Sequence, residues 1–256
     1  MTLKKPSNQQ VKNWKKLLMG KYRKREGLFL AEGVRCVEQI LENGIIQVDE
    51  LLLEKGTNEI DYLQRFDVPI YELESEDFLS ISDTENSQGV IAVCQTPFKV
   101  NLDELVLSEG VIVATDAIQD PGNLGTMIRT ASWFDVSGFI FGTGTVDSFH
   151  PKVVRSTAGA TGRLAYQSGD LSKMINEFEE HGWDVVLMDG GEGSISLKEV
   201  EPARRTLIVV GNEGSGISGK LFTSTRKKVR IDGKSEAVES LNAAVALGIG
   251  LFQFKG

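Results

Sequence analysis

Short apolar runs alternate with amphipathic stretches along most of this 256-residue chain. In the first hundred residues the runs have strand length, and the stretches between them carry apolar residues at helical spacing, as Val34, Val37 and Leu41 do. The pattern predicts strands at 28–31, 48–53, 69–73 and 88–95 and helices at 8–20, 33–42, 58–66 and 75–79. This alternation is typical of a small α/β domain, which we place at residues 1–97, with Pro97 ending its last strand.

The second half of the chain alternates in the same way. The pattern predicts strands at 111–116, 138–141, 164–166, 183–188, 206–210 and 229–231 and helices at 123–134, 151–160 and 171–181. A final helix opens around 240–242 and continues to Phe254. Because these strands are apolar almost throughout, they predict a mostly parallel sheet that helices cover on both faces. We expect a second α/β domain at residues 104–256.

The final helix is more apolar than one buried face requires. Leu241, Val245, Gly248 and Phe252 recur at helical spacing, and almost no charge interrupts the helix before Lys255. The helix after residue 123 likewise carries apolar residues on more than one side. A helix on a parallel sheet needs one apolar face, so the surplus predicts a second partner. That partner is either the N-terminal domain or another copy of the chain.

Composition limits the class of protein. A hydrophobic share of 41% and a charged share of 25% are those of a soluble globular protein. Cys36 and Cys94 lie far apart in apolar surroundings, which indicates neither a metal site nor a disulfide framework and favours the reducing cytoplasm. The two histidines are too few for a His-rich metal site, so we expect no metal. No signal peptide or membrane span is visible, and we expect no membrane partner.

Charge is unevenly distributed along the chain. The first 26 residues contain nine Lys or Arg and one Glu, although the whole chain has 28 basic and 36 acidic residues. A basic arm on an acidic body can steer a polyanion to one face, and Trp14 and Tyr22 lie within the arm, where they could stack on bases. The alternative is a solvated helix surface. The candidate RNA-binding residues of the arm are Lys12, Lys15, Lys16, Arg23 and Arg25.

Glycine-rich loops follow the predicted strands that end at Asp116, Asp189 and Val210. Ligands of open α/β sheets bind beyond the carboxyl ends of the strands, where these loops lie. The loop 211–217 lacks the Lys-Ser/Thr pair of a nucleotide P-loop, and the glycines at 142–144 lack the third glycine of a dinucleotide fingerprint. These absences disfavour an ATP site and a nicotinamide oxidoreductase. The remaining alternative for the glycines is ordinary tight turns.

Taken together, three loops resemble the three motifs of the SpoU/TrmH-type RNA 2′-O-ribose methyltransferases of the SPOUT class, over about residues 110–254. The matching residues are Asn123, Gly125 and Arg129 in the first motif, Glu213 in the second, and Ser240, Leu241 and Asn242 in the third. The segment 151–160, with Arg155 at a basic position, also resembles the family. The chain departs from the family at Asp232-Gly233, where relatives usually have Pro-Met in a loop that contacts the cofactor.

The resemblance implies methyl transfer from S-adenosylmethionine to a ribose 2′-hydroxyl of ribosomal or transfer RNA. Arg129 would stabilise the oxygen as it loses its proton. The alternative that the family offers for an arginine at this place is a general base, which the protonated state of a guanidinium disfavours. The other implied catalytic residues are Asn123, Glu213, Ser240 and Asn242, and the implied cofactor-binding residues are Gly190, Gly211, Gly216, Ile231 and Leu241. The alternative is a catalytically idle RNA-binding protein with the same fold.

The resemblance also implies an architecture. Relatives have a deep trefoil knot at the C-terminal helix, and many carry a ribosomal-protein-like substrate-binding domain at the N-terminus. They form homodimers through the helix after Asn123 and the final helix, so Arg155 could reach the target ribose of the other subunit. We therefore expect an RNA-binding homodimer built on the catalytic domain.

Overall fold

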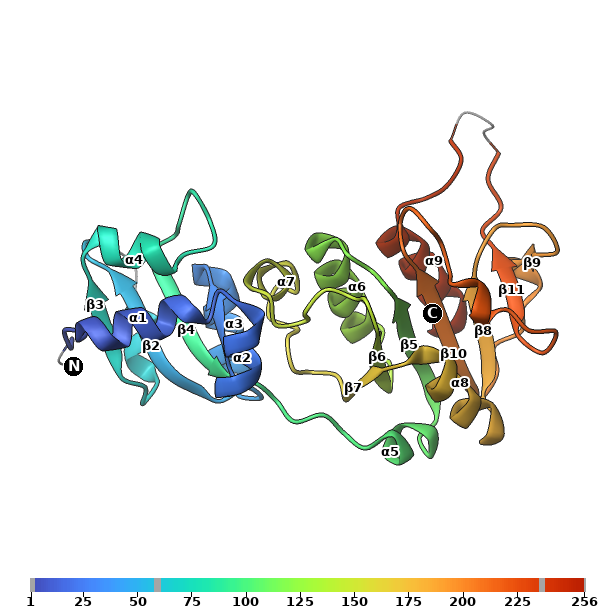
Figure 1. Cartoon of the computed structure of the whole chain (residues 1–256), viewed down its shortest axis with the longest axis horizontal. Coiled ribbons are helices and arrows are strands. Elements are labelled where there is room, and N and C mark those ends of the chain that lie inside the picture. Colours follow the sequence, from blue (N-terminus) through green and yellow to red (C-terminus); the bar gives the residue numbers. More distant parts are fainter. Residues whose placement is uncertain (1–2, 58–60, 235–237, 256) are drawn as a thin grey trace. The chain divides into compact units, whose positions relative to one another are not determined.

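The computed structural model describes residues 3–57, 61–234 and 238–255 (Figure 1). The chain divides into two compact units. One contains the residues before Lys99 together with Asp147–Gly162, and the other contains Lys99–Val146 and the residues from Arg163 onward. The boundaries at 97 and 104 stay a prediction. The second passage of the chain through the first unit was not anticipated, because a pattern read along the chain does not show which sheet a short helix packs on.

The first unit is built on a mixed sheet. Its strand order is β1-β4-β2-β3, in which β4 is antiparallel to both neighbours and β2 is parallel to β3. The strands are β1 (Leu28–Glu32), β2 (Val48–Glu54), β3 (Ile70–Leu73) and β4 (Val90–Gln95). The helices are α1 (Asn8–Lys16), α2 (Gly20–Glu26), α3 (Val34–Asn43), α4 (Ser75–Ile81) and the 3₁₀ helix η1 (Asp61–Arg65). Residues of α3 form the core on one face, and residues of α1 and α4 form it on the other.

The helix expected at residues 8–20 ends at Lys16, and a separate helix, α2, begins at Gly20. Ser7 caps α1 through a capping box with Gln10, and Met19, in extended conformation, precedes α2. Trp14 is buried in the core beneath α1, and its indole N–H donates to the Glu50 carboxylate at 2.6 Å. The expectation that Trp14 stacks on RNA bases is therefore wrong, because its ring is needed inside the unit.

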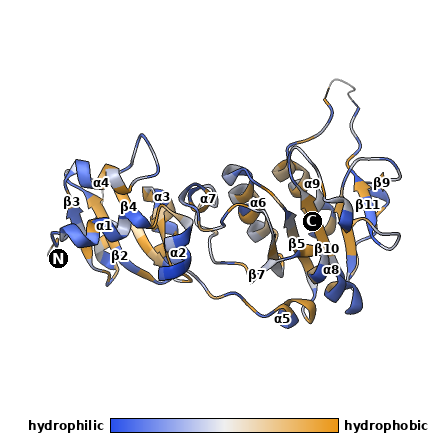
Figure 2. Cartoon of the chain, in the orientation of Figure 1, coloured by the Kyte–Doolittle hydropathy of each residue, from blue (hydrophilic) through white to orange (hydrophobic). Residues whose placement is uncertain are grey.

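The second unit contains a parallel sheet, as the apolar strands predicted. Within the described ranges its order is β7-β6-β5-β10-β8-β11-β9, and each neighbouring pair is parallel. The strands are β5 (Gly110–Asp116), β6 (Gly138–Gly142), β7 (Tyr166–Gly169), β8 (Asp184–Met188), β9 (Ile195–Ser196), β10 (Arg205–Gly211) and β11 (Lys227–Arg230). Figure 2 shows hydrophobic colours along β8 and β10, as expected of buried strands.

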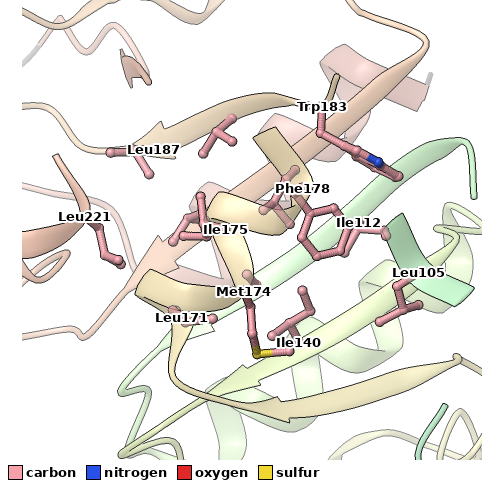
Figure 3. Packing of buried hydrophobic residues seen from close by; sticks show 14 of the residues in the cluster. Leu105, Ile112, Ile140, Leu171, Met174, Ile175, Phe178, Trp183, Leu187 and Leu221 are labelled. Carbon is pink, nitrogen blue, oxygen red and sulfur yellow. The ribbon is translucent and has the colours of Figure 1, made fainter. Parts of the chain in front are cut away.

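Helices cover both faces of this sheet. The helices of the second half are α5 (Leu102–Val106), α6 (Pro121–Trp133), α8 (Leu171–Glu180), α9 (Ala243–Lys255) and the 3₁₀ helices η2 (Leu197–Glu199) and η3 (Gly219–Leu221), while α7 (Pro151–Ser156) belongs to the first unit. Phe178 of α8 packs with Trp183 and Leu187 in the core on one face (Figure 3). On the other face α9 packs against α6, β8 and β10, with Gly250 against Met188.

The strand order has a reversal beside β5. The strands that directly follow β5 in the chain, β6 and β7, lie on one side of it, whereas the later strands β8 and β10 lie on its other side. Such a reversal opens a crevice at the carboxyl ends of the strands, where ligands bind in open parallel sheets. The threading of α9 through a knotted loop stays a prediction. None of the helices in the described ranges is long and apolar enough to cross a bilayer.

Candidate active site

A cleft of about 730 Å³ lies at the carboxyl ends of β8 and β10. Three segments line it: residues 188–191 after β8, residues 210–216 after β10, and residues 239–246 at the start of α9. Volumes of this order are typical of pockets that hold small molecules and cofactors. The cleft thus joins two of the three loops of the sequence resemblance with the loop after Asp189.

Asn212 shapes the loop after β10. Its Oδ1 accepts hydrogen bonds from the backbone N–H groups of Gly214 at 2.9 Å and Ser215 at 3.0 Å. Its Nδ2 donates to the carbonyl of Ala117 at 2.9 Å, which ties this loop to the end of β5. Asn212 was not among the site residues predicted from the sequence. The available signal was an Asn at the start of a glycine-rich turn, where its side chain commonly bonds to the backbone two residues later.

Gly211 is required by the closeness of the same loop. A Cβ at this position would lie 2.4 Å from the carbonyl carbon of Gly216 and from the backbone nitrogen of Ile217. Gly216 itself has φ +69°, which side chains other than glycine seldom adopt. Other residues therefore cannot replace Gly211 and Gly216 without distorting this loop.

Hydrogen bonds connect the three motifs directly. The Nδ2 of Asn242 donates to the Oδ1 of Asn123 at 2.9 Å, and the Nδ2 of Asn123 donates to the Oε1 of Glu213 at 2.8 Å. Asn242 also caps α9, because its Oδ1 accepts from the backbone N–H of Ala244 at 2.9 Å and of Val245 at 3.3 Å. Asn242 therefore caps α9 and at the same time contacts Asn123.

The helix expected to begin at residue 123 begins at Pro121, so Asn123 lies in its first turn. Asp120 caps α6, since its carboxylate accepts from the backbone N–H of Asn123 at 2.7 Å and Pro121 occupies the first turn. The Asn123 side chain is thereby free to face Glu213 and Asn242.

Arg129 lies on α6, six positions after Asn123, which is about 9 Å along the helix axis. Its side chain is exposed, and within the described ranges it forms no hydrogen bond or ion pair. Ser240 is also exposed and lines the cleft. Arg129 is thus an available cation on the helix that carries Asn123, outside the described lining of the cleft.

The expected cofactor residues mostly meet at the cleft. Gly190, Gly211, Gly216 and Leu241 line it, whereas Ile231 is not part of its described lining. The glycine-rich walls expose backbone N–H and C=O groups, which can bind an adenine edge and an amino-acid group without steric hindrance from side chains. In size and lining the cleft fits S-adenosylmethionine.

The departure from the family at Asp232 has a structural role. The Ser196 hydroxyl donates to one carboxylate oxygen of Asp232, and the Nε of Arg230 donates to the other at 3.1 Å. The hydrogen bond from Ser196 and the positive charge of Arg230 hold the pKa of Asp232 below its usual value. Asp232 therefore connects the end of β11 to β9.

Arg23 does not belong to the exposed basic surface. Only 4% of it is exposed, its Nε and Nη2 donate to Asp147 at 2.9 and 2.7 Å, and its Nη1 donates to the carbonyls of Leu17 and Leu18. Its expected contact with RNA is therefore corrected to a structural role, in which it ties α2 to the second passage of the chain. Charge counting along the sequence cannot show which cations are buried.

Lys12, Lys15, Lys16 and Arg25 remain accessible. The ammonium of Lys16 and the guanidinium of Arg25 lie 5.9 and 4.8 Å from the ring centre of Tyr22. Lys16 of α1 and Arg25 of α2 therefore lie near the same aromatic ring.

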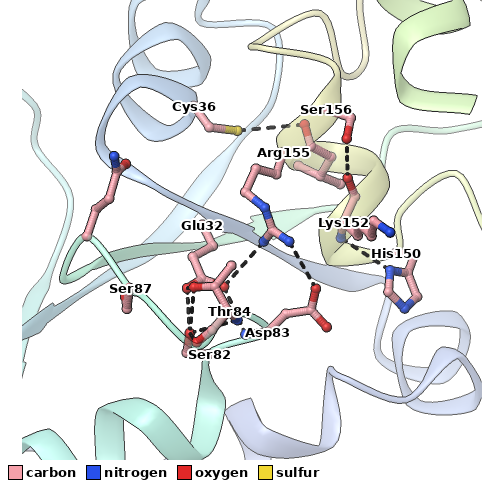
Figure 4. Close-up of polar contacts among 12 residues, drawn as sticks. Glu32, Cys36, Ser82, Asp83, Thr84, Ser87, His150, Lys152, Arg155 and Ser156 are labelled. Carbon is pink, nitrogen blue, oxygen red and sulfur yellow. Dashed lines mark hydrogen bonds and ion pairs between the residues drawn. The ribbon is translucent and has the colours of Figure 1, made fainter. Parts of the chain in front are cut away.

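Arg155 is bound within the first unit. From α7 its Nη2 contacts Asp83 at 3.3 Å and its Nη1 lies 3.6 Å from the carboxylate of buried Glu32 (Figure 4). Glu32 also accepts hydrogen bonds from the hydroxyls of Ser82 and Thr84. In this arrangement Arg155 is engaged by two carboxylates, so the expectation that it reaches the RNA of another subunit has no support here.

The cleft and its three linked motifs agree with comparisons to known proteins. The SpoU rRNA Methylase family matches residues 110–252, which is more than half of the chain. The chain belongs to this family. Residues 8–92 match the MRM3-like substrate binding domain. The family resemblance, the methyltransferase activity and the use of S-adenosylmethionine predicted from the sequence are thereby confirmed.

Individual relatives extend over nearly the whole chain. The chain is 32% identical to the 23S rRNA (guanosine(2553)-2′-O)-methyltransferase RlmP of Bacillus subtilis (strain 168), over 97% of both proteins. It is similar to an AdoMet-bound rRNA methyltransferase from Sinorhizobium meliloti, with a TM-score of 0.84 and 26% identity over 98% of this chain and 97% of the other. It is also similar to the AdoMet complex of the SpoU methyltransferase AviRb from Streptomyces viridochromogenes, with a TM-score of 0.83 and 25% identity over 96% of this chain and 97% of the other.

Proposed function

We propose that this SpoU-family methyltransferase methylates a ribose 2′-hydroxyl of large-subunit ribosomal RNA in the cytoplasm. The observation that carries the proposal is the hydrogen-bonded set of Asn242, Asn123 and Glu213 beside a cofactor-sized cleft. The similarity to RlmP over both full chains favours a ribosomal target over transfer RNA.

Bound S-adenosylmethionine supplies a methyl group that its sulfonium has already activated. The chain must then hold the ribose oxygen in line and stabilise it as its proton leaves. Arg129 is the cation we assign to that developing charge, because it is exposed and unpaired within the described ranges. Ser240 and Glu213, both on the cleft wall, offer a hydroxyl and a carboxylate acceptor to the ribose.

The first unit provides a surface for RNA capture. We assign this role to the basic face, which we define as Lys12, Lys15, Lys16, Lys21 and Arg25. The last three of these lie near the ring of Tyr22. Cations at this spacing can neutralise phosphates. The match to a substrate-binding domain over residues 8–92 includes all of them.

We further propose that the second unit forms a homodimer. Trp133 at the end of α6 is 84% exposed, and along α9 the exposed fractions of Val245, Ile249 and Phe252 are 51%, 38% and 69%. Val245, Ile249 and Phe252 recur at helical spacing along α9, and α6 packs against α9; together with Trp133 these side chains are here called the α6/α9 face. Single exposed apolar side chains are common, but a contiguous set indicates an interface. A second copy presenting the same face would bury it.

Two measurements test the proposed reaction. Calorimetry of the purified protein with S-adenosylmethionine should show binding, and incubation of undermethylated ribosomal RNA with methyl-labelled cofactor should place label at one ribose. Mapping of alkali-resistant linkages would then identify the nucleotide. RNA binding without transfer to any ribosomal or transfer RNA would instead support the catalytically idle alternative.

A further inference from the structure

The direction of the hydrogen bonds at Asn242 is fixed by the helix that it caps. Its Oδ1 accepts from two backbone N–H groups, at Ala244 and Val245. Rotating the amide by half a turn would place the Nδ2 donors against these backbone donors, leaving the first turn of α9 uncapped. The Nδ2 of Asn242 is therefore the group that must face Asn123.

This constraint passes to Asn123 and then to Glu213. Facing a donor, Asn123 must present its Oδ1, which accepts from Asn242 at 2.9 Å. Its Nδ2 then points to Glu213 and donates at 2.8 Å. An ionised carboxylate can only accept, so the ionised form of Glu213 completes the series with every donor matched to an acceptor.

We propose that Asn242 is a positioning residue that sets the amide orientation of Asn123 and thereby holds the Glu213 carboxylate as an oriented acceptor at the cleft wall. Asn123 lies on α6, Glu213 in the loop after β10 and Asn242 at the start of α9, so the series forms only when these three segments are assembled. The Oε1 of Glu213 is engaged by Asn123, and its Oε2 forms no hydrogen bond within the described ranges and is available to substrate. This inference rests on the proposed methyl transfer.

Reversing the series tests the proposal. Asn242→Asp keeps an oxygen for the cap but removes the donor, so Asn123 turns to donate to the new carboxylate and presents its Oδ1 to Glu213. Acceptor then faces acceptor, and we expect turnover to fall by about tenfold or more, with little change in cofactor affinity, as for removal of a preorganised hydrogen bond. Adding Glu213→Gln supplies an Nε2 donor and rebuilds all the bonds in the opposite direction.

The expected result is coupling between the two substitutions. Turnover of the Asn242→Asp/Glu213→Gln enzyme should exceed the product of the two single losses by about fivefold or more, since residues in one hydrogen-bond network are not additive. The matched control is Asn242→Ser with Glu213→Gln. Serine also caps α9 but neither accepts from nor donates to Asn123 at that distance, so its losses should multiply.

The same cycle is measured by thermal unfolding, which does not require activity. Coupling in both measurements supports the positioning role. The positioning role is overturned if the wild-type enzyme methylates RNA but the losses of the single variants simply multiply in both the Asp/Gln and the Ser/Gln double variants. A wild-type protein that methylates no RNA, while unfolding still shows the coupling, overturns the proposed function but not the hydrogen-bond series. Binding of S-adenosylmethionine by each variant confirms that the cleft is folded.

Discussion

At the scale of single residues, Arg129 carries the main chemical prediction. Arg129→Ala should lower turnover by about a hundredfold or more, because a preorganised cation for the developing oxygen charge is removed. Affinity for S-adenosylmethionine should change little, since Arg129 lies outside the described lining of the cleft. Single-turnover methylation and calorimetry measure the two effects separately.

Arg129→Lys serves as the matched variant. It keeps the positive charge but replaces a planar fork with a point charge, so we expect at most a small recovery. If the Arg129→Ala enzyme turns over nearly as fast as the wild type, Arg129 does not take part in the reaction.

At the scale of secondary-structure elements, α8 is tied to the start of β11 by a buried arginine. Arg226 is 7% exposed and donates to Glu179 at 3.0 Å from Nε and 2.7 Å from Nη2. The hydrogen bonds and charge of Arg226 hold the pKa of Glu179 below its usual value. A carboxyl whose folded-state pKa is depressed stabilises the fold above its unfolded-state pKa, and this contribution is lost as pH falls through the folded-state pKa.

The pH dependence of unfolding checks this link. The thermal midpoint of the wild-type protein should fall as pH is lowered below the ordinary range of a glutamate. Glu179→Gln should lower the midpoint at neutral pH and reduce its further loss in acid, because its amide does not titrate. A control substitution at exposed Glu177, whose carboxylate accepts no hydrogen bond within the described ranges, should leave the acid-dependent loss unchanged. Equal acid sensitivity of Glu179→Gln and the wild type would contradict the assignment.

At the scale of the whole molecule, the α6/α9 face predicts the oligomeric state. Phe252→Glu places a charge in the proposed interface, where burying it without a partner is costly. The full-length variant should be a monomer by light scattering at micromolar concentration, whereas the wild type should be a dimer. Leu107→Glu is the matched control, because Leu107 is 66% exposed but lies at the end of α5, outside this face. A monomeric wild type would refute the dimer.

The basic face predicts how RNA binding depends on salt. Lys12→Gln/Lys15→Gln should reduce the slope of log K against log salt by about 0.7 to 0.9 for each phosphate that the protein no longer neutralises. Lys173→Gln/Lys198→Gln removes two exposed charges elsewhere and should leave the slope unchanged. Filter binding at several salt concentrations measures both slopes. If the slope of Lys12→Gln/Lys15→Gln equals that of the wild type, the two lysines of α1 do not contact RNA phosphates.

The sequence by itself determined the elements whose signals are local. Apolar runs such as 111–116 became parallel strands of the second sheet, because a strand buried on both faces needs apolar residues at every position. The motif residues Asn123, Glu213 and Asn242 could also be identified from the sequence, since each stands at a fixed place in one of the three motifs. The expected family and cofactor followed from those residues.

Only the tertiary structure decided which side chains meet. Arg23 and Arg25 are indistinguishable in a count of charge, yet Arg23 is buried against Asp147 while Arg25 is exposed. Asn212 gained its importance only when the end of β5 came beside the loop after β10. Hydrogen-bond partners and burial depend on residues far apart in the chain, and no local pattern records which distant segment will lie against which, because that is settled by the packing of the whole fold.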